Sequence, residues 1–396
     1  MKISSIVEKL FKPSKCSKKI FIDNFGFKNR GDQLMIQSVM DQVRDNIPSA
    51  QIFVRENVFL ENPSYCIANK LYPLAASNSG KKHWSMVKKL TNKLLCDDWI
   101  VTPSDIDVVL DCCGYHFTDF WMKDESSFYY YQKYYASFSK PNRKIIFLPQ
   151  AFGPFNNEWS GRAMQLAYDV ADMVYCRDDV SFSMLQSILR DTQKIKIAPD
   201  FTCLCEPEKN PSVQLPSKQY VLLIANSNMV KNTDKTIGDQ YISFLKEITS
   251  FLLDRGETVY LLNHEGMEDE ELLKELNKTM PKSMPILTNL DGAEIKAIIK
   301  DSKLLISDRF HGLVSGLTQG VPCLCIGWSH KYAELLKEHQ CEGNRMDVND
   351  LESAIKSISE ALTQPYKYSS KESCEEHLEN RVHEMWADVF DVISKA

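Results

Sequence analysis

The chain has 396 residues, 43% of them hydrophobic and 25% charged, and this length fits two domains of ordinary size. The composition excludes collagen-like, disordered and small disulfide-linked proteins. The net charge of −6 argues against nucleic acid as a partner, because a protein that follows a phosphate backbone needs a basic excess.

The cysteines indicate a reducing compartment. There are 12 of them and no two form a CxxC pair. Neighbouring cysteines adjoin or alternate within apolar stretches, which is typical of small buried side chains in strands: Cys112/Cys113, Cys203/Cys205 and Cys323/Cys325. No set has the spacing of zinc ligands. We therefore expect a cytoplasmic protein that uses neither a metal nor a cofactor.

In chain order, the first expected element is a basic amphipathic helix within residues 1–19. Its apolar residues recur at helical spacing among six lysines: Ile3, Ile6, Val7, Leu10 and Phe11. Such a helix can lie on an anionic membrane surface, which would place residues 2–15 at the inner face of the cell membrane. A first helix packed on its own domain is the other interpretation, and both stay open. No apolar run approaches the roughly 18 residues of a membrane span.

Residues 20–205 are predicted to form an N-terminal Rossmann-like domain. Short apolar runs alternate there with amphipathic stretches, a pattern typical of parallel sheets built from βαβ units. The expected strands are Ile20–Asp23, Ile52–Val54, Val108–Leu110, Lys144–Leu148, Met173–Cys176 and Ile195–Ile197. Residues 206–218 carry three prolines and no periodicity, so we predict a linker.

The pattern restarts in residues 219–371, which predicts a C-terminal Rossmann-like domain. Its expected strands are Tyr220–Ile224, Thr258–Leu262, Leu304–Ser307 and Pro322–Ile326. A final helix in residues 372–396 is expected to cross back to the first domain. The predicted fold class is therefore α/β, with two Rossmann-like domains whose parallel sheets face each other across a cleft.

The most informative group of polar residues follows the expected strand Leu304–Ser307. Asp308-Arg309-Phe310-His311-Gly312 stands between this strand and a helix, where open parallel sheets bind their ligands. The guanidinium of Arg309 offers a planar fork for a carboxylate or phosphate. His311 can exchange a proton near neutral pH. The alternative is a capped turn in which Arg309 pairs with Asp308.

This run, followed by Gly320-Val321-Pro322 and Gly327-Trp328-Ser329-His330-Lys331-Tyr332, resembles the C-terminal signature of the polysaccharide pyruvyl transferase family. Four earlier stretches are similar to family motifs in the expected order: Asn24-Phe25-Gly26 through Gly31-Asp32, Pro149-Gln150-Ala151-Phe152-Gly153-Pro154, Arg177-Asp178-Asp179 with Ser181, and Ala198-Pro199-Asp200. Asp308 replaces the serine usual in the family. Asp111-Cys112-Cys113-Gly114 replaces a glycine run, and only Gly114 keeps its conformational freedom.

The resemblance implies a GT-B-like architecture and the formation of a pyruvate ketal on a sugar, with phosphoenolpyruvate as donor substrate. The sugar would belong to a surface polysaccharide or to its lipid-linked precursor, for example one carried by a polyprenyl chain. It implies that Arg309 holds the donor, assisted by Arg177, Gly312, His330 and Lys331. For Arg177, an ion pair with Asp178 or Asp179 is an equal alternative. For His330 and Lys331, the alternative is a surface position without a role in donor binding.

Proton transfer is assigned to His311, with Asp200 and His116 as further candidates; Asp200 equally suits a turn. The acceptor sugar is expected at residues of the first domain: Asn24, Gly26, Asp32, Gly114, Asp119 and Gln150. Asp32 is also expected as a helix N-cap, and Gln150 as a backbone prop. The aromatic residues from Tyr115 to Tyr135 suit either sugar stacking or a buried helix. His264 and Glu265 also follow an expected strand.

Two other functions remain. A glycosyltransferase that uses a nucleotide sugar could share the architecture, although the sequence has neither GxGxxG nor GxxxxGK[ST] at a strand-to-helix turn. The second alternative function is glycan binding without turnover by a family member that has lost its activity. The presence of Arg309 and His311 argues against this alternative.

Overall fold

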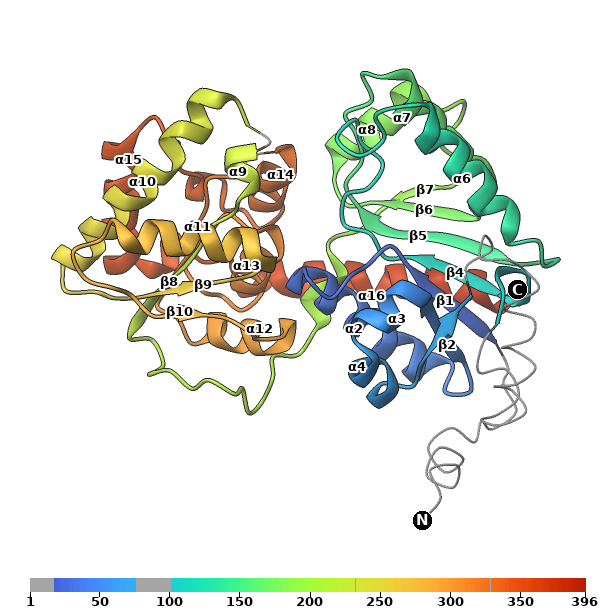
Figure 1. The fold of residues 1–396 in the computed structure, drawn as a ribbon, viewed down its shortest axis with the longest axis horizontal. Coiled ribbons are helices and arrows are strands. Elements are labelled where there is room, and N and C mark those ends of the chain that lie inside the picture. The colour runs from blue at the N-terminus through green and yellow to red at the C-terminus, as the bar shows by residue number, and fades with distance from the viewer. Residues whose placement is uncertain (1–17, 76–100, 232, 328) are drawn as a thin grey trace, which may run out of the picture. The chain divides into compact units, whose positions relative to one another are not determined.

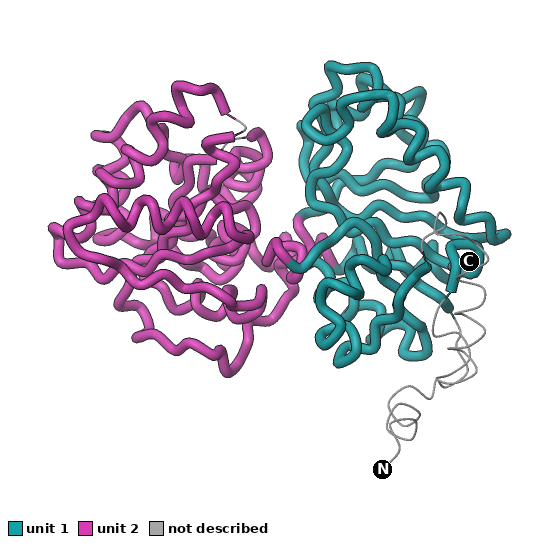
Figure 2. The backbone as a smooth tube through the Cα atoms, in the orientation of Figure 1, with its two compact units in different colours: residues 1–27, 35–199, 383–396 teal, residues 28–34, 200–382 magenta. Residues whose placement is uncertain are grey.

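The computed structural model describes residues 18–75, 101–231, 233–327 and 329–396. The basic segment 2–15 and Trp328 lie outside the described residues. The chain divides into two compact units (Figure 2): unit 1 contains Met1–Phe27, Met35–Pro199 and His383–Ala396, and unit 2 contains Lys28–Leu34 and Asp200–Val382. A short segment that follows the first strand thus belongs to unit 2, whereas the end of the last helix belongs to unit 1.

Unit 1 is built on a seven-stranded parallel sheet (Figure 1) in the order β3-β2-β1-β4-β5-β6-β7. The strands are β1 (Lys19–Asp23), β2 (Gln51–Arg55), β3 (Leu71–Leu74), β4 (Val108–Asp111), β5 (Lys144–Gln150), β6 (Met173–Cys176) and β7 (Ile195–Ile197). The strand order reverses between β1 and β4, where Asp23 pairs with Asp111 in register. Ligands of open parallel sheets bind beside such a reversal, at the carboxyl ends of the strands.

The helices of unit 1 begin at polar caps and bury apolar faces on the sheet. They are α2 (Arg30–Asn46), α3 (Glu56–Glu61), α4 (Pro63–Ala68), α6 (Glu125–Ser137), α7 (Glu158–Val170) and α8 (Asp179–Ile188). The side chains of Asp124, Asn157 and Asp178 accept backbone hydrogen bonds at the starts of α6, α7 and α8. One core joins these three helices to the sheet. Its helical members include Tyr131, Met164 and Leu185.

Unit 2 contains a five-stranded parallel sheet in the order β10-β9-β8-β11-β12. The strands are β8 (Tyr220–Ile224), β9 (Thr258–Leu262), β10 (Ile286–Leu287), β11 (Leu304–Ser307) and β12 (Cys323–Leu324). Its helices are α9 (Asn228–Lys231), α10 (Lys235–Asp254), α11 (Gly266–Lys278), α12 (Gly292–Lys300), α13 (Phe310–Leu317), α14 (His330–Glu338), α15 (Leu351–Thr363) and the start of α16 (Glu372–Ser394). Two apolar cores cover the two faces of the sheet, one with α10, α11 and α15 and the other with α12, α13 and α14.

The two parallel α/β sheets confirm the predicted fold class, but the sequence analysis missed two edge strands. β3 contains Pro73, and a proline argues against a strand because it cannot donate to the ladder. β3 is an edge strand that pairs with β2, and only Leu74 at its end also bridges Val101, so the missing N–H of Pro73 is tolerated. β10 has only two residues, too few for a recognisable alternation. No helix within the described ranges is both long and apolar enough to cross a membrane.

Candidate active site

Asp200 and His311, two of the expected proton-transfer residues, come together in unit 2. Nε2 of His311 lies 3.4 Å from Oδ2 of Asp200, and both side chains are buried. Asp200 precedes a short 3-10 helix, and its Oδ1 accepts hydrogen bonds from the backbone N of Thr202 at 3.0 Å and from Oγ1 of Thr202 at 2.5 Å. These two bonds orient the carboxylate, so that Oδ2 remains available to the imidazole.

Gly31 lies directly against the ring of His311. A Cβ atom built on Gly31 would stand 2.0 Å from Nδ1 of His311, far inside contact distance. Gly31 belongs to the first turn of α2, and its N–H donates to Oδ1 of Asn29 at 2.9 Å. The expectation that Asp32 caps this helix is wrong, because α2 begins at Arg30 and Asp32 stands within the first turn. The position of Gly31 therefore requires a residue without a side chain, because any Cβ there would overlap the ring of His311.

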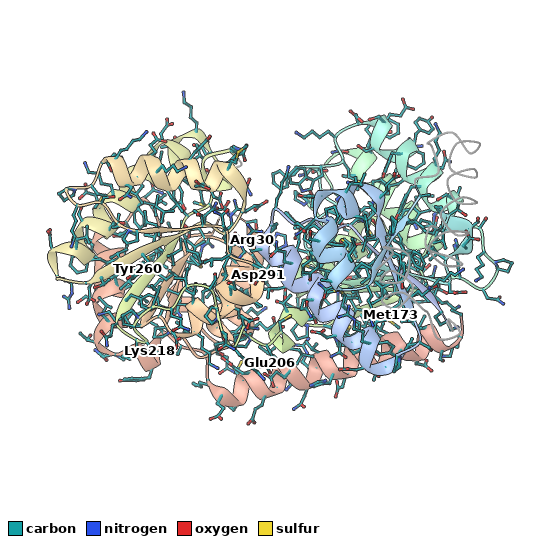
Figure 3. All side chains as sticks on the ribbon, turned by 60° about the horizontal axis from the view of Figure 1, so that its bottom comes forward. Arg30, Met173, Glu206, Lys218, Tyr260 and Asp291 are labelled. Atoms are coloured by element: carbon teal, nitrogen blue, oxygen red, sulfur yellow. The ribbon has the colours of Figure 1, made fainter. Side chains whose placement is uncertain are left out.

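The segment that carries Gly31 is held by the start of α12 and by the end of β9. The N–H of Gly292 donates to Oε1 of Gln33 at 2.9 Å, and the N–H of Arg30 donates to the carbonyl of His264 at 3.3 Å. Arg30 and Asp291, the N-cap of α12, lie close together (Figure 3). Burial lowers the pKa of Arg30, and the nearby carboxylates of Asp291 and Glu294 act in the opposite direction.

Arg309 is buried and engaged by two carboxylates of unit 2. Its Nε donates to Oδ2 of Asp269 at 2.7 Å, its Nη2 donates to the other oxygen of Asp269, and its Nη1 donates to Glu265. The side chain of Asp269 is fully buried, whereas that of Glu265 is 34% exposed. The inner contact is therefore a fixed bidentate clamp, and the outer contact reaches the surface.

Asp308 does not pair with Arg309, so this alternative for the turn is wrong. Its carboxylate instead accepts hydrogen bonds from the hydroxyl of Tyr241 at 2.6 Å and from the N–H of Ile326 at 2.8 Å. Its carbonyl accepts from Nδ2 of Asn226 and from the hydroxyl of Tyr332, each at 2.7 Å. Burial raises the pKa of Asp308 to about 6. This residue ties β11 to β12, α10 and α14.

His264 completes the group around α13. Its ring is buried, and neither ring nitrogen has a hydrogen-bond partner in the part of the chain that the structure describes. Cδ2 of His264 would lie 3.7 Å from a Cβ on Gly312, against the first turn of α13. Burial, together with the neighbouring side chains of Arg309, His311 and Arg30, lowers the pKa of His264 well below its usual value. The ring is therefore neutral at pH 7.

In unit 1 the reversal of the strand order carries a second polar cluster. Nη2 of Arg55 donates to Oδ2 of Asp23 at 2.9 Å, Nε donates to the other oxygen, and the hydroxyl of Tyr134 also donates to Asp23. Nδ2 of Asn24 donates to Oδ2 of Asp111 at 2.6 Å, and Nε2 of Gln150 donates to Oδ1 at 3.1 Å. Burial, and after it the charge of Asp23, raises the pKa of Asp111 to about 7.

The other expected residues of unit 1 are held in structural contacts. Nε2 of His116 contacts the hydroxyl of Tyr131, and burial lowers the pKa of His116 to about 4, so its ring is neutral at pH 7. Asp119 accepts from the N–H groups of Asn156 and Asn157 and from Oγ of Ser160, which fixes the loop before α7. Gly114 is half-buried, and its carbonyl accepts from the N–H of Ala151.

The remaining expected residues are distributed over both units. Arg177 is buried in unit 1, and its N–H donates to the carbonyl of Gln150 at 3.0 Å. His330 and Lys331 begin α14 in unit 2, and Nζ of Lys331 lies 5.5 Å from the ring centre of Phe310. Asn24 and Gly26 belong to unit 1, whereas Asp32 belongs to unit 2. Of the aromatic residues in α6, Tyr131 and Tyr135 are buried, while Tyr129 and Tyr130 are exposed.

Sequence reasoning missed four charged residues of these clusters: Asp23, Arg55, Asp111 and Asp269. The first three are the last residues of β1, β2 and β4, so their signal was a charged residue directly after an apolar strand. Asp269 gave no such signal, because it stands inside an acidic amphipathic helix. Among the described residues, no group of three or more His, Cys, Asp and Glu side chains is arranged to hold a metal ion.

Residues 29–330 match the sequence model of a family described as polysaccharide pyruvyl transferase. No curated protein matches the chain. Among solved structures, UDP-GlcNAc 2-epimerase of Methanocaldococcus jannaschii, in complex with UDP-GlcNAc and UDP, has a TM-score of 0.58 at 14% identity, over 93% of this chain and 99% of that one. HepE of Anabaena in complex with UDP-glucose has a TM-score of 0.60 at 11% identity, over 94% and 99%. At such identities the likeness shows the fold alone, which is of the GT-B type.

Proposed function

The chain belongs to the polysaccharide pyruvyl transferase family, and we propose that it transfers the pyruvyl group of phosphoenolpyruvate to a sugar as a ketal. The acceptor is a sugar of a surface polysaccharide or of its lipid-linked precursor. The observation that carries the proposal is the pair of His311 and Asp200 beside the first turn of α13. A proton-exchanging group next to a helix N-terminus suits a reaction of an anionic donor.

The proposed reaction forms two C–O bonds and breaks one. Two hydroxyl oxygens of the sugar bond to C2 of phosphoenolpyruvate, and the bond from C2 to the phosphate oxygen breaks. One hydroxyl proton ends on the methylene carbon, which becomes a methyl group, and the other ends on the released phosphate. No electrons are gained or lost overall, so neither a redox cofactor nor an oxidant is required. The reaction needs groups that take up and deliver protons near a dianionic phosphate.

His311 is the group that we assign to this proton exchange, with Asp200 as the residue that orients it. An imidazole can both take up and deliver a proton, and the carboxylate of Asp200 fixes the orientation of its ring. Arg309 lies at the same edge of the sheet, and its outer contact with the half-buried Glu265 is the one that a donor anion can replace. Lys331, close to Phe310, adds positive charge.

We assign the acceptor sugar to unit 1, at the carboxyl ends of β1, β4 and β5. Asn24 and Gln150 lie there around Asp111. Amide side chains can both donate to and accept from sugar hydroxyls. Asp119 is left out of this assignment, because its carboxylate already holds two backbone N–H groups and Ser160.

We also propose a cytoplasmic enzyme that reaches a lipid-linked acceptor through residues 2–15. These residues carry lysines around an apolar stripe, which suits an anionic membrane surface. Deletion of residues 2–15 should reduce association with vesicles that contain an anionic lipid, while activity on soluble sugars is retained. Unchanged association would rule out the membrane contact without affecting the assigned reaction.

The alternative function is transfer from a nucleotide sugar. It is favoured by the fold, because both solved structures named above contain a UDP-sugar. Thermal-shift titration with UDP-sugars and with phosphoenolpyruvate separates the two donors. Stabilisation by a UDP-sugar and none by phosphoenolpyruvate would favour the alternative.

The decisive experiment is phosphate release from phosphoenolpyruvate with a panel of galactosyl and mannosyl acceptors. Wild type is compared with Arg309→Ala and His311→Ala, and with His377→Gln as a control at an exposed histidine of α16. The proposal predicts release that depends on the acceptor, is lost in the first two variants and is retained in the control. Absence of release with every acceptor, together with no thermal shift by phosphoenolpyruvate, would overturn it.

A further inference from the structure

Asp111 has no counterpart in the family's usual glycine run, yet it is the centre of the polar cluster in unit 1. Its side chain is buried at the carboxyl end of β4, and three groups donate hydrogen bonds to it. Nδ2 of Asn24 donates to Oδ2 at 2.6 Å, while Nε2 of Gln150 and the N–H of Cys113 donate to Oδ1 at 3.1 and 3.2 Å. Both carboxylate oxygens are therefore in use.

All three groups that meet Asp111 are N–H donors, so both of its oxygens act as acceptors and each amide faces it with its nitrogen. Asn24 and Gln150 both turn their nitrogens towards Asp111 and their oxygens away. The oxygen of Asn24 accepts a hydrogen bond from Nη2 of Arg55 at 3.1 Å. The oxygen of Gln150 is buried and has no hydrogen-bond partner in the described ranges of the chain. A buried acceptor without a donor is rare in folded proteins and indicates a missing partner.

The rest of the cluster holds the Asn24 amide in the same orientation, with its nitrogen towards Asp111. Arg55 forms a bidentate pair with Asp23, and its Nη1 donates to the hydroxyl of Tyr130 at 2.9 Å. Guanidinium groups only donate, so Arg55 cannot accept from Asn24 and the Asn24 amide cannot turn over.

We infer that Asp111 is a positioning residue, which orients the amides of Asn24 and Gln150 so that the free oxygen of Gln150 accepts a hydrogen bond from a hydroxyl of the acceptor sugar. The inference rests on the proposed function, in that the acceptor is assigned to unit 1. The ligand is a polyhydroxylated sugar that presents an O–H donor. A carboxylate or phosphate oxygen would repel the oxygen of Gln150 and would not bind there.

The test is Asp111→Asn, which keeps the shape but turns one of the two acceptors into an NH₂ donor. Because Arg55 holds the Asn24 amide, the new NH₂ takes the place of Oδ1, where it faces the N–H of Cys113 and Nε2 of Gln150, and the Gln150 amide has to turn. The KM of the acceptor is expected to rise about tenfold, which corresponds to about 1.4 kcal/mol. The KM of phosphoenolpyruvate and kcat should stay within about twofold, because neither is assigned to this cluster.

The double variant Asp111→Asn with Gln150→Glu exchanges the carboxylate and the amide. A donor at position 111 then again faces an acceptor at position 150, and the second oxygen at position 150 remains free. The acceptor KM is expected to return to within about threefold of wild type. The control is Asp107→Asn at the opposite end of the β4 region, where Oδ1 binds Lys140 at 2.5 Å. It should leave all three constants unchanged.

Three results would overturn the inference: an unchanged acceptor KM in Asp111→Asn, a fall in kcat alone, or a double variant as weak as the single one. Equilibrium titration with the same galactosyl and mannosyl sugars separates this inference from the donor assignment. If wild type releases no phosphate but binds a sugar that Asp111→Asn binds about tenfold more weakly, the donor is wrong and the positioning role stands. If wild type binds none of these sugars, the positioning role is wrong.

Discussion

Oδ2 of Asp200 lies 3.4 Å from Nε2 of His311, while Oδ1 of Asp200 is held by both the N–H and the hydroxyl of Thr202. The carboxylate is thus anchored on one oxygen and faces the imidazole with the other. The separation is longer than a strong charge-assisted hydrogen bond. In catalytic histidines such a pair sets the orientation of the ring, and a bound anion can shorten it.

This relationship predicts that Asp200 and His311 act as a unit. We expect His311→Gln and Asp200→Asn each to lower kcat by about 10²- to 10⁴-fold, the usual contribution of a positioned proton-transfer group. The double variant should be only slightly slower than the slower single variant, because groups that act together are not additive. Steady-state phosphate release measures all three. Independent, multiplying losses would show that the two residues do not cooperate.

Gly31→Ala is predicted to damage activity more than stability. The added Cβ would stand 2.0 Å from Nδ1 of His311, so His311 has to leave its position beside Asp200. We expect kcat to fall by about 10²-fold, as for a small displacement of a catalytic group. The matched control is Gly161→Ala in α7, where a Cβ meets nothing within 4 Å. Equal activity of the two variants would contradict the proposed contact's importance.

The fold could be predicted from the sequence because its cause is local. Apolar runs such as Tyr220–Ile224 and amphipathic stretches such as Gln240–Asp254 alternate, and parallel sheets follow from this alternation. The placement of Arg309 and His311 at a strand's carboxyl end was predictable for the same reason. Pro73 in β3 shows the limit, since a residue disfavoured in central strands is acceptable in a strand at the edge of the sheet.

The partners of the site residues could not be predicted, because side-chain pairing depends on packing between distant elements. Asp269 lies 40 residues before Arg309, on a helix whose acidic residues all look alike in sequence. Asp111 and Gln150 are joined only because β4 and β5 are neighbours in the sheet. Asp308 shows the same point: a pairing with the adjacent Arg309 was the simple expectation, yet its partners are Tyr241 and Ile326.

The two carboxylates around Arg309 should behave differently when their charge is removed. Asp269→Asn breaks a fully buried bidentate pair and leaves a buried guanidinium with less compensation, so we expect a loss of about 3–5 kcal/mol in the free energy of unfolding. Glu265→Gln removes a charge from a half-exposed position, where the expected loss is below about 1 kcal/mol. Urea denaturation measures both.

Glu265→Gln has a second expected effect, on donor binding. The carboxylate of Glu265 occupies Nη1 of Arg309, the part of the fork that faces the more exposed side. Its neutral replacement should compete less with a donor anion, and the Kd of phosphoenolpyruvate should fall about threefold to tenfold. Calorimetric titration checks this. A rise in Kd would mean that Glu265 supports the donor site and does not compete for it.

Asp308→Asn is predicted to change how stability depends on pH. Asp308 is buried, and burial raises its pKa from 3.8 to about 6. The folded protein therefore keeps a proton that the unfolded chain has already lost between these two values. The contribution of Asp308 to the stability of the wild type therefore falls as pH rises through this window and is constant above it.

The asparagine variant lacks this titration but keeps the contacts. Its amide oxygen can accept from the N–H of Ile326, and its NH₂ can donate to the hydroxyl of Tyr241, which can rotate to accept. The stability of the variant relative to wild type should therefore increase by roughly 2.5 kcal/mol between about pH 4 and pH 8, at about 1.4 kcal/mol for each pKa unit. Urea denaturation of both proteins at both pH values measures this change. The difference between the two proteins contains no contribution from the titrating groups that they share. A difference that stays the same at both pH values would show that the carboxylate of Asp308 is ionised throughout this range, held by its two hydrogen bonds in spite of its burial.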